Sequence, residues 1–300
     1  MATIHQYCAP WAAILPYVLL YKCVMTKSFI TMQNHEAEMK RYPYDRVLFH
    51  PGHYCRTCNF VKPARSKHCS FCKACISRHD HHCVWLMNCV GAGNYVYFLS
   101  LLLSLSILLI YGTILGHVLL RQTLTELIPA DVQTAMESWT IYFNIWGIVI
   151  AADPKIGTVT LLMLMTAPLA MAFLAYHTYL IWAGMTTNES AKWSDLKEDL
   201  VDGFVFKADR NSIPDAPLYM DLGDQPWPIL SNQIIVTDGD PPMEGYNLAS
   251  DSNRVYYDRG GEAPVDSRWT RLYSMRDVDN IYDLGFCGNL RDAIGLSVRR

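Results

Sequence analysis

Residues 55–94 decide how this sequence is interpreted: CRTCNFVKPARSKHCSFCKACISRHDHHCVWLMNCVGAGN. Seven of the chain's ten cysteines lie between Cys55 and Cys89, and six histidines lie in or just before the same stretch (His50, His53, His68, His79, His81 and His82). A disulfide scaffold would leave one of the seven thiols unpaired and would have no use for the histidines. Cysteine mixed with histidine at two-residue spacings instead indicates zinc, held by thiolates on a reducing, cytosolic face.

The number of ligands leaves one cysteine over. A structural zinc ion takes four ligands, so two ions need eight. Six of the seven cysteines together with His68 and His82 supply eight, although the count alone does not say which cysteine remains. Cys83 directly follows Asp80, His81 and His82. A thiol beside a histidine that faces a carboxylate is typical of an activated nucleophile.

Apolar runs on either side of this block predict membrane-spanning helices. Residues 95–120 and 156–183 are long and uncharged, which predicts two transmembrane helices. Residues 1–24 are apolar but interrupted by prolines, and we interpret them as a marginal membrane helix. A signal peptide is the alternative, and truncation of a longer N-terminus would explain why the helix is marginal. The apolar run within the connection 121–155 is short, which favours an interfacial or re-entrant segment.

Charge predicts the orientation. Residues 22–94 contain eleven Lys and Arg, residues 184–300 contain twelve, and the connection contains two. The positive-inside rule therefore places the zinc block, 25–94, and the tail, 184–300, in the cytosol, and the connection in the lumen. Within the tail, residues 209–267 are rich in Pro, Gly, Asp and Ser and are expected to form a long loop or to be disordered. A net charge of −3 argues against nucleic acid as a partner.

The block at 55–94 resembles the cysteine-rich domain of the Asp-His-His-Cys (DHHC) palmitoyltransferases. The motifs that carry the resemblance are Cys55-Arg-Thr-Cys58, Lys62-Pro-Ala-Arg65, His68-Cys-Ser-Phe-Cys-Lys-Ala-Cys75, Asp80-His-His-Cys83, Trp85, Asn88-Cys-Val-Gly91 and Asn94. Thr186-Thr-Asn-Glu189 and the segment 280–289 are similar to two further motifs of the family. Details around the block are similar to the fungal spore-wall-formation branch.

The resemblance implies a role for each site residue. It assigns one zinc to Cys55, Cys58, His68 and Cys75, and a second zinc to Cys69, Cys72, His82 and Cys89. Cys83, His81 and Asp80 are left for catalysis. Thr187 is expected near the active site, and Asn289 is expected to tie the tail to membrane-helix backbone. Lys62, Arg65 and Lys67 are candidates to bind the phosphates of coenzyme A.

The expected protein is an α-helical polytopic membrane protein with a cytosolic, loop-rich two-zinc domain between its spans. Its expected function is protein S-acyl transfer from acyl-CoA, such as palmitoyl-CoA, to juxtamembrane cysteines of substrate proteins. The endoplasmic reticulum is the expected location and the Golgi the alternative. A catalytically silent zinc-bearing membrane adaptor is the other functional hypothesis. Two features depart from the family: Val84 replaces a proline, and one weak span instead of two precedes the zinc domain.

Overall fold

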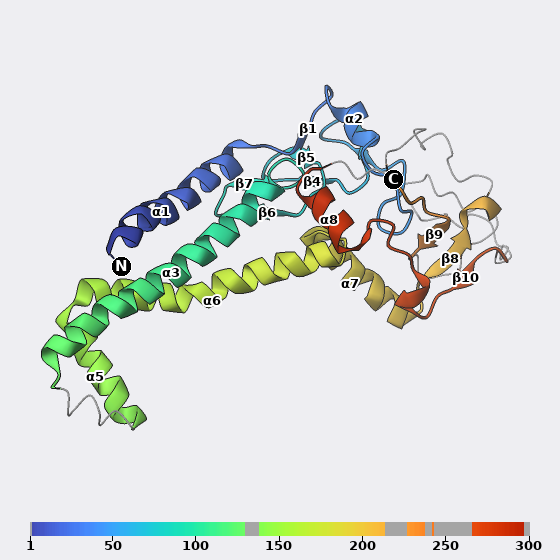
Figure 1. Cartoon of the computed structure of the whole chain (residues 1–300). Helices are drawn as coiled ribbons and strands as arrows, with labels where there is room; N and C mark the ends of the chain where they lie inside the picture. The colour runs from blue at the N-terminus through green and yellow to red at the C-terminus, as the bar shows by residue number, and fades with distance from the viewer. Residues whose placement is uncertain (1, 130–137, 214–226, 238–241, 243–265, 297–300) are drawn as a thin grey trace. The chain divides into compact units, whose positions relative to one another are not determined.

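The structure is a computed structural model that describes residues 2–129, 138–213, 227–237, 242 and 266–296 (Figure 1). The chain divides into two compact units, each made of two segments. One unit combines residues 1–22 with 97–177, and the other combines residues 23–96 with 178–300.

Among the described residues, three helices are long and apolar enough to cross a membrane, which confirms the predicted polytopic helical class. They are α1 (Ala2–Met25), α3 (Tyr95–Leu127) and α6 (Pro154–Trp182). Helix α3 extends beyond Leu120, its predicted end, and continues through Arg121 to Leu127. The shorter apolar helix α5 (Trp139–Ala152) lies immediately before α6, in the segment for which an interfacial or re-entrant helix is expected.

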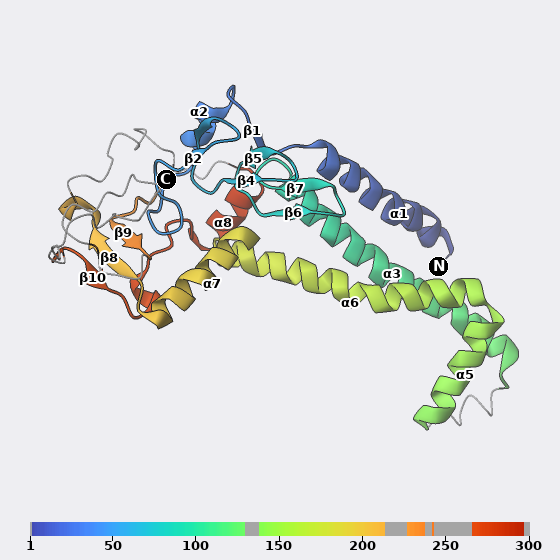
Figure 2. The same cartoon turned by 180° about the vertical axis from the view of Figure 1, so that it is seen from behind.

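Small residues let α3 and α6 approach each other closely. A Cβ atom on Gly116 would lie 2.0 Å from Oγ1 of Thr160, and one on Gly112 would lie 2.1 Å from the sulfur of Met163. Close approach of this kind gives membrane helices their van der Waals contact. Further toward the C-terminal end of α3, Leu120 and Leu124 pack with Ile145 and Val149 of α5. Figures 1 and 2 both show α5 beside the end of α3 and the start of α6.

The cysteine-rich block folds into three β-hairpins of the same design. They are β2 (Tyr54–Cys55) with β3 (Phe60–Val61), β4 (Lys67–Cys69) with β5 (Ala74–Ile76), and β6 (His81–Cys83) with β7 (Asn88–Val90). The register is the same in each, pairing Cys55 with Phe60, Cys69 with Ala74 and Cys83 with Asn88. Each turn ends in a residue of positive φ, at Asn59, Lys73 and Met87. The hairpin therefore repeats every 14 residues.

Two further elements complete this part of the second unit. The short strand β1 (Phe29–Ile30) pairs antiparallel with β5 and so extends the second hairpin to three strands. Helix α2 (His35–Met39) follows β1, and Met39 packs in a buried aromatic cluster with Tyr42, Tyr44 and Tyr282.

The tail is more ordered than its composition predicts. It contains α7 (Thr187–Asp202), β8 (Phe206–Asp209), η1 (Arg210–Ser212), β9 (Gln233–Val236), β10 (Thr270–Arg271), η3 (Met275–Asp277) and α8 (Gly285–Ala293). The three strands form an antiparallel sheet in the order β10-β8-β9.

The prediction of loop or disorder for 209–267 is wrong at β9. Ile234 and Val236 pack against one side with Trp269, while Ile235 packs on the other side with Leu196. A strand buried on both faces shows no alternation of polar and apolar residues, so its sequence lacks the usual strand pattern. The Pro- and Gly-rich stretches at 238–241 and 243–265, which prompted the prediction, lie outside the described residues.

Candidate active site and metal centres

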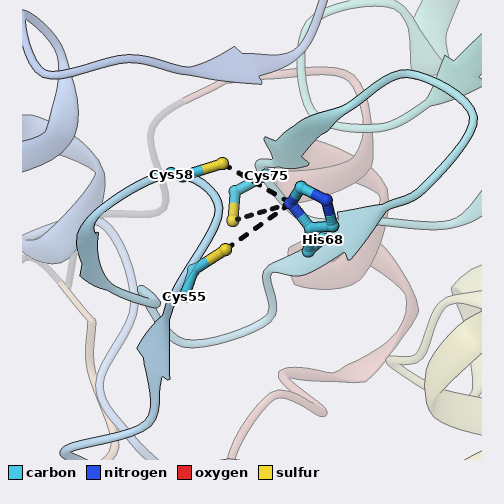
Figure 3. Close-up of side chains that lie close together, drawn as sticks. All are labelled: Cys55, Cys58, His68 and Cys75. Atoms are coloured by element: carbon cyan, nitrogen blue, oxygen red, sulfur yellow. Dashed lines mark hydrogen bonds between the residues drawn. The ribbon is translucent and has the colours of Figure 1, made fainter.

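The first cluster of cysteine and histidine brings together four side chains from two neighbouring hairpins (Figure 3). The sulfur atoms of Cys55, Cys58 and Cys75 lie 3.5, 3.4 and 3.9 Å from Nδ1 of His68. In a tetrahedral zinc site, with Zn–S near 2.3 Å and Zn–N near 2.0–2.1 Å, sulfur and nitrogen ligands would be about 3.6 Å apart. The spacing of these four atoms therefore fits one tetrahedral metal ion.

The second cluster has the same arrangement one hairpin further along. The sulfur atoms of Cys69, Cys72 and Cys89 lie 3.6, 3.4 and 3.6 Å from Nδ1 of His82. Each cluster thus joins the Cys-x-x-Cys pair of one hairpin to the histidine and cysteine of the next. Both sets of four ligand atoms are close enough together to hold a metal ion.

The third hairpin breaks the pattern at a single position. Cys83 occupies the place that Cys55 and Cys69 hold in the first two hairpins. Where those hairpins have their second thiol, the third has Leu86, which is buried. The chain then enters α3 at Tyr95, so no following hairpin supplies further ligands. Cys83 is therefore the cysteine that the two clusters leave over.

Asp80 and His81 lie beside this free thiol. Nδ1 of His81 is 2.7 Å from Oδ2 of Asp80, whose side chain is fully buried. Burial by itself would lower the pKa of His81, but hydrogen bonds to Asp80 and to Cys83 raise that pKa to about 9. Burial likewise would raise the pKa of Cys83, and its hydrogen bond from His81 brings the pKa below the usual value for a thiol. The arrangement favours a thiolate beside an imidazolium.

Thr187 also binds Asp80, through two hydrogen bonds. Its backbone N–H donates to Oδ1 of Asp80 at 3.0 Å, and its hydroxyl donates to Oδ2 at 2.8 Å. The residue that caps α7 is instead Thr186, which forms a capping box with Glu189. Thr187 is therefore free to bind Asp80, as the resemblance led us to expect.

Arg65 has no access to a phosphate of coenzyme A, which corrects the expectation for this residue. It is 1% exposed, and its Nε and Nη2 donate to the two carboxylate oxygens of Glu189 at 2.7 and 2.6 Å. Its Nη1 donates to Asp292 at 3.3 Å. Because this buried guanidinium is already paired with two carboxylates, it is not available to bind a phosphate.

Lys62 and Lys67, the other two candidates, line a pocket of about 260 Å³. Three residues that the sequence analysis did not select also line it: Lys192, His50 and His53. Burial lowers the pKa of His50 to about 4, so this histidine is neutral at physiological pH. The positive charge at the pocket therefore comes from its lysines. Their spacing along the chain gives no signal, because Lys192 belongs to α7 and the others to the zinc block.

Two further residues are placed clearly. Asn289 donates to the backbone carbonyl of Trp182, the last residue of α6, at 3.3 Å, which is the tie to helix backbone expected of it. Trp85, one of the residues that carry the family resemblance, is 90% exposed, so it is not a core residue.

The acidic and aromatic partners of Arg65 could not be identified from the sequence, with one exception. Glu189 lies in the motif that resembles Thr-Thr-x-Glu, and this motif could have marked it as a site residue. Asp292 and Tyr42 lie in no motif, and Arg78 is one of many basic residues in the zinc block. Their contacts join positions more than 200 residues apart, such as Tyr42 with Asp292. Such separations leave no local pattern.

Comparison with known proteins agrees with this geometry. The model of the DHHC palmitoyltransferase family matches residues 48–194. The chain is 60% identical to palmitoyltransferase swf1 of Aspergillus fumigatus, covering 100% of this chain and 81% of that protein. It is 56% identical to palmitoyltransferase swf1 of Emericella nidulans (98% and 73% covered) and 30% identical to palmitoyltransferase SWF1 of Saccharomyces cerevisiae (94% and 72% covered). The chain therefore belongs to the DHHC palmitoyltransferase family, on its Swf1 branch, and is a protein S-palmitoyltransferase of the membrane.

Proposed function

We propose that Cys83 carries the acyl group as a thioester between the two halves of the reaction. The observation that supports this is the position of Cys83: among the cysteines of residues 55–89 it is the one outside both metal clusters, and it lies against His81 and Asp80. In the first half, the Cys83 thiolate attacks the thioester carbon of acyl-CoA and the coenzyme A thiolate leaves, taking the proton held by His81. In the second half, a substrate cysteine gives its proton to His81 and attacks the Cys83 thioester, which frees Cys83.

Asp80 and Thr187 serve this reaction by orienting His81. Asp80 accepts from Nδ1 of His81, which directs the other ring nitrogen away from the carboxylate. The two hydrogen bonds from Thr187 fix both oxygens of Asp80. A base held this way contributes about 10²- to 10⁴-fold to the rate of proton transfer steps.

The two metal clusters are proposed to hold structural zinc. Three thiolates and one imidazole form a closed tetrahedral set, which leaves no position for substrate. Bound zinc would fix the hairpins, whose short strands bury little apolar surface on their own. The first site would use Cys55, Cys58, His68 and Cys75, and the second Cys69, Cys72, His82 and Cys89.

The lysine-lined pocket is proposed to bind the phosphates of acyl-CoA. Lys62 and Lys67 remain from the original candidates, and Lys192 joins them. Nζ of Lys67 donates to the side-chain oxygen of Asn188, the residue after Thr187, at 2.9 Å. This contact connects the pocket to the segment that binds Asp80, which supports the proposal that coenzyme A binds here.

The membrane topology is also a proposal. The excess of Lys and Arg on both sides of the pair α3 and α6 supports a cytosolic active site. Substrates would then be proteins with cysteines near the cytosolic surface of the membrane, in the endoplasmic reticulum or the Golgi. The hypothesis of a silent adaptor is disfavoured, because Asp80, His81 and Cys83 are all present and in contact.

Labelled palmitoyl-CoA tests the proposal directly. The Cys83→Ser variant should show no thioester-linked label and no transfer to a substrate protein, while its zinc content stays near two per chain. Cys287→Ser is the matched control, because Cys287 is an exposed thiol outside the site. Loss of a zinc ion in Cys83→Ser, or a normal thioester label, would show that Cys83 has been given the wrong role.

A further inference from the structure

Asp292, in the last turn of α8, is the acceptor at the centre of a buried polar cluster. Its Oδ1 accepts from the hydroxyl of Tyr42 at 2.7 Å. Its Oδ2 accepts from Nε of Arg78 at 2.9 Å and from Nη1 of Arg65 at 3.3 Å. Asp292 is 9% exposed, and the two arginines are 4% and 1% exposed. One carboxylate thus bridges two buried guanidinium groups.

The charges in this cluster balance only when Asp292 is ionised. Arg65 and Arg78 contribute two positive charges, and Glu189 and Asp292 contribute two negative ones. Among the described residues, the arginine that pairs with Glu189 is Arg65. Within the described part of the chain, Asp292 is the carboxylate that pairs with Arg78, and the pKa of Asp292 is held below its usual range by Arg78 and Arg65 against the effect of burial. A buried cation without a carboxylate would be strongly unfavourable.

Two chains of contacts lead from Asp292 to Asp80. The first passes along the backbone: Arg78, which pairs with Asp292, lies between β5 and β6 and precedes Asp80 by two residues. The second runs through Arg65 to Glu189, whose carboxylate accepts from the backbone N–H of Thr186 at 2.9 Å. The next residue donates both hydrogen bonds that hold Asp80. Asp292 is therefore connected to Asp80, the residue that orients His81, by two separate routes.

From this arrangement we infer that Asp292 is a positioning residue for acyl transfer, through which α8 fixes Asp80 and, through Asp80, His81. The inference rests on the proposed roles of Asp80 and His81. It assigns to the C-terminal helix a part in the reaction, although α8 contributes no group that contacts substrate. Tyr42 and two arginines of the zinc block, Arg65 and Arg78, all contact this one carboxylate.

The test is the single-turnover rate of Cys83 acylation by palmitoyl-CoA, measured on the full-length chain and expressed per folded molecule that contains two zinc ions. Asp292→Asn keeps the shape of the side chain and removes its charge. Misplacement of a reacting group costs up to about 100-fold in rate, so we expect a fall of about 10- to 100-fold. The apparent KM for palmitoyl-CoA should stay within about twofold, because the lysine-lined pocket does not include Asp292.

A second variant covers the case in which Asp292→Asn does not fold. Tyr42→Phe keeps the ring under Arg65 and removes one hydrogen bond to Asp292, so the rate should fall by about 2- to 10-fold. Asp195→Asn, an exposed position on α7, is the control and should keep the normal rate.

The outcomes separate the two proposals. A normal rate per zinc-loaded molecule in both Asp292→Asn and Tyr42→Phe, together with a slowed Asp80→Ala, would overturn the positioning role and leave the proposed mechanism intact. A normal rate in Asp80→Ala as well would instead overturn the mechanism. If the Asp292 and Tyr42 variants yield less folded, zinc-loaded protein but each such molecule reacts at the normal rate, Asp292 stabilises the fold and does nothing more.

Discussion

Glu189→Gln should destabilise the zinc-containing unit far more than a change of surface charge would. Glu189 is 1% exposed and accepts from two nitrogens of Arg65, at 2.7 and 2.6 Å. Glutamine keeps an oxygen that can accept from Thr186 in the capping box, so the variant removes mainly the charge. It leaves Arg65 buried and sharing Asp292 with Arg78.

The magnitude follows from the burial of both partners. Removing one partner of a buried ion pair costs about 3–5 kcal/mol, because the remaining charge is not compensated. For a protein of this size each kcal/mol lowers the thermal midpoint by about 2–4 °C, which gives a decrease of about 6–20 °C.

The assay is thermal unfolding of the purified protein in detergent, at one fixed scan rate, with the zinc content measured before heating. Glu198→Gln is the matched control, because Glu198 is exposed on the same helix, and its midpoint should not change measurably. A midpoint for Glu189→Gln within about 2 °C of the wild type would refute the reasoning. It would mean that Arg65 finds other compensation or that water reaches the pair.

Four further predictions concern the metal sites, the base, the third hairpin and the topology. Cys89→Ser removes a ligand from a site whose metal is needed for folding, so the protein should lose zinc and aggregate; a well-folded variant with two zinc ions would show that the ligand set is wrong. His81→Ala should slow thioester formation by about 10²- to 10⁴-fold with zinc retained, and a normal rate in a quench-flow measurement would remove the histidine from the mechanism. Leu86→Cys restores a Cys-x-x-Cys pair to the third hairpin, so micromolar zinc should inhibit this variant reversibly and a chelator should restore it, while the wild type is unaffected. Asn188 lies in the chain's single N-glycosylation sequon and should carry no glycan, because the proposed topology places it in the cytosol; a shift in mobility after endoglycosidase treatment would refute that topology.

Much of the metal-binding block could be predicted from the sequence because its ligands are close along the chain. Cys55 and Cys58 define a short turn, and the count of eight ligands and one remaining thiol follows from the residues. The spacing of 14 residues between Cys55, Cys69 and Cys83 was also present, and it could have shown the threefold hairpin repeat before the structure did. Membrane helices were equally accessible, since their length and lack of charge are local properties.

The support for the active site could not be predicted, because it depends on contacts between distant segments. Arg65 looked like a ligand for phosphate, as a basic residue in a polar block normally would. Its burial is decided by Glu189 and Asp292, which lie 124 and 227 residues away in the chain. Strand β9 was missed for a similar reason, because residues from α7 and from near β10 cover its two faces.

The third hairpin shows how little separates a structural repeat from a reactive one. Its backbone is that of a metal-binding knuckle, and its first sulfur stands where two others in the chain are arranged to bind metal. Replacement of the second thiol by Leu86 leaves that sulfur in a fixed place with an incomplete set of ligands. A module built only for support would thereby acquire a preformed nucleophile, and the histidine and aspartate beside it are the only chemical additions it needs. Such a route from scaffold to enzyme involves the loss of one ligand and no new fold.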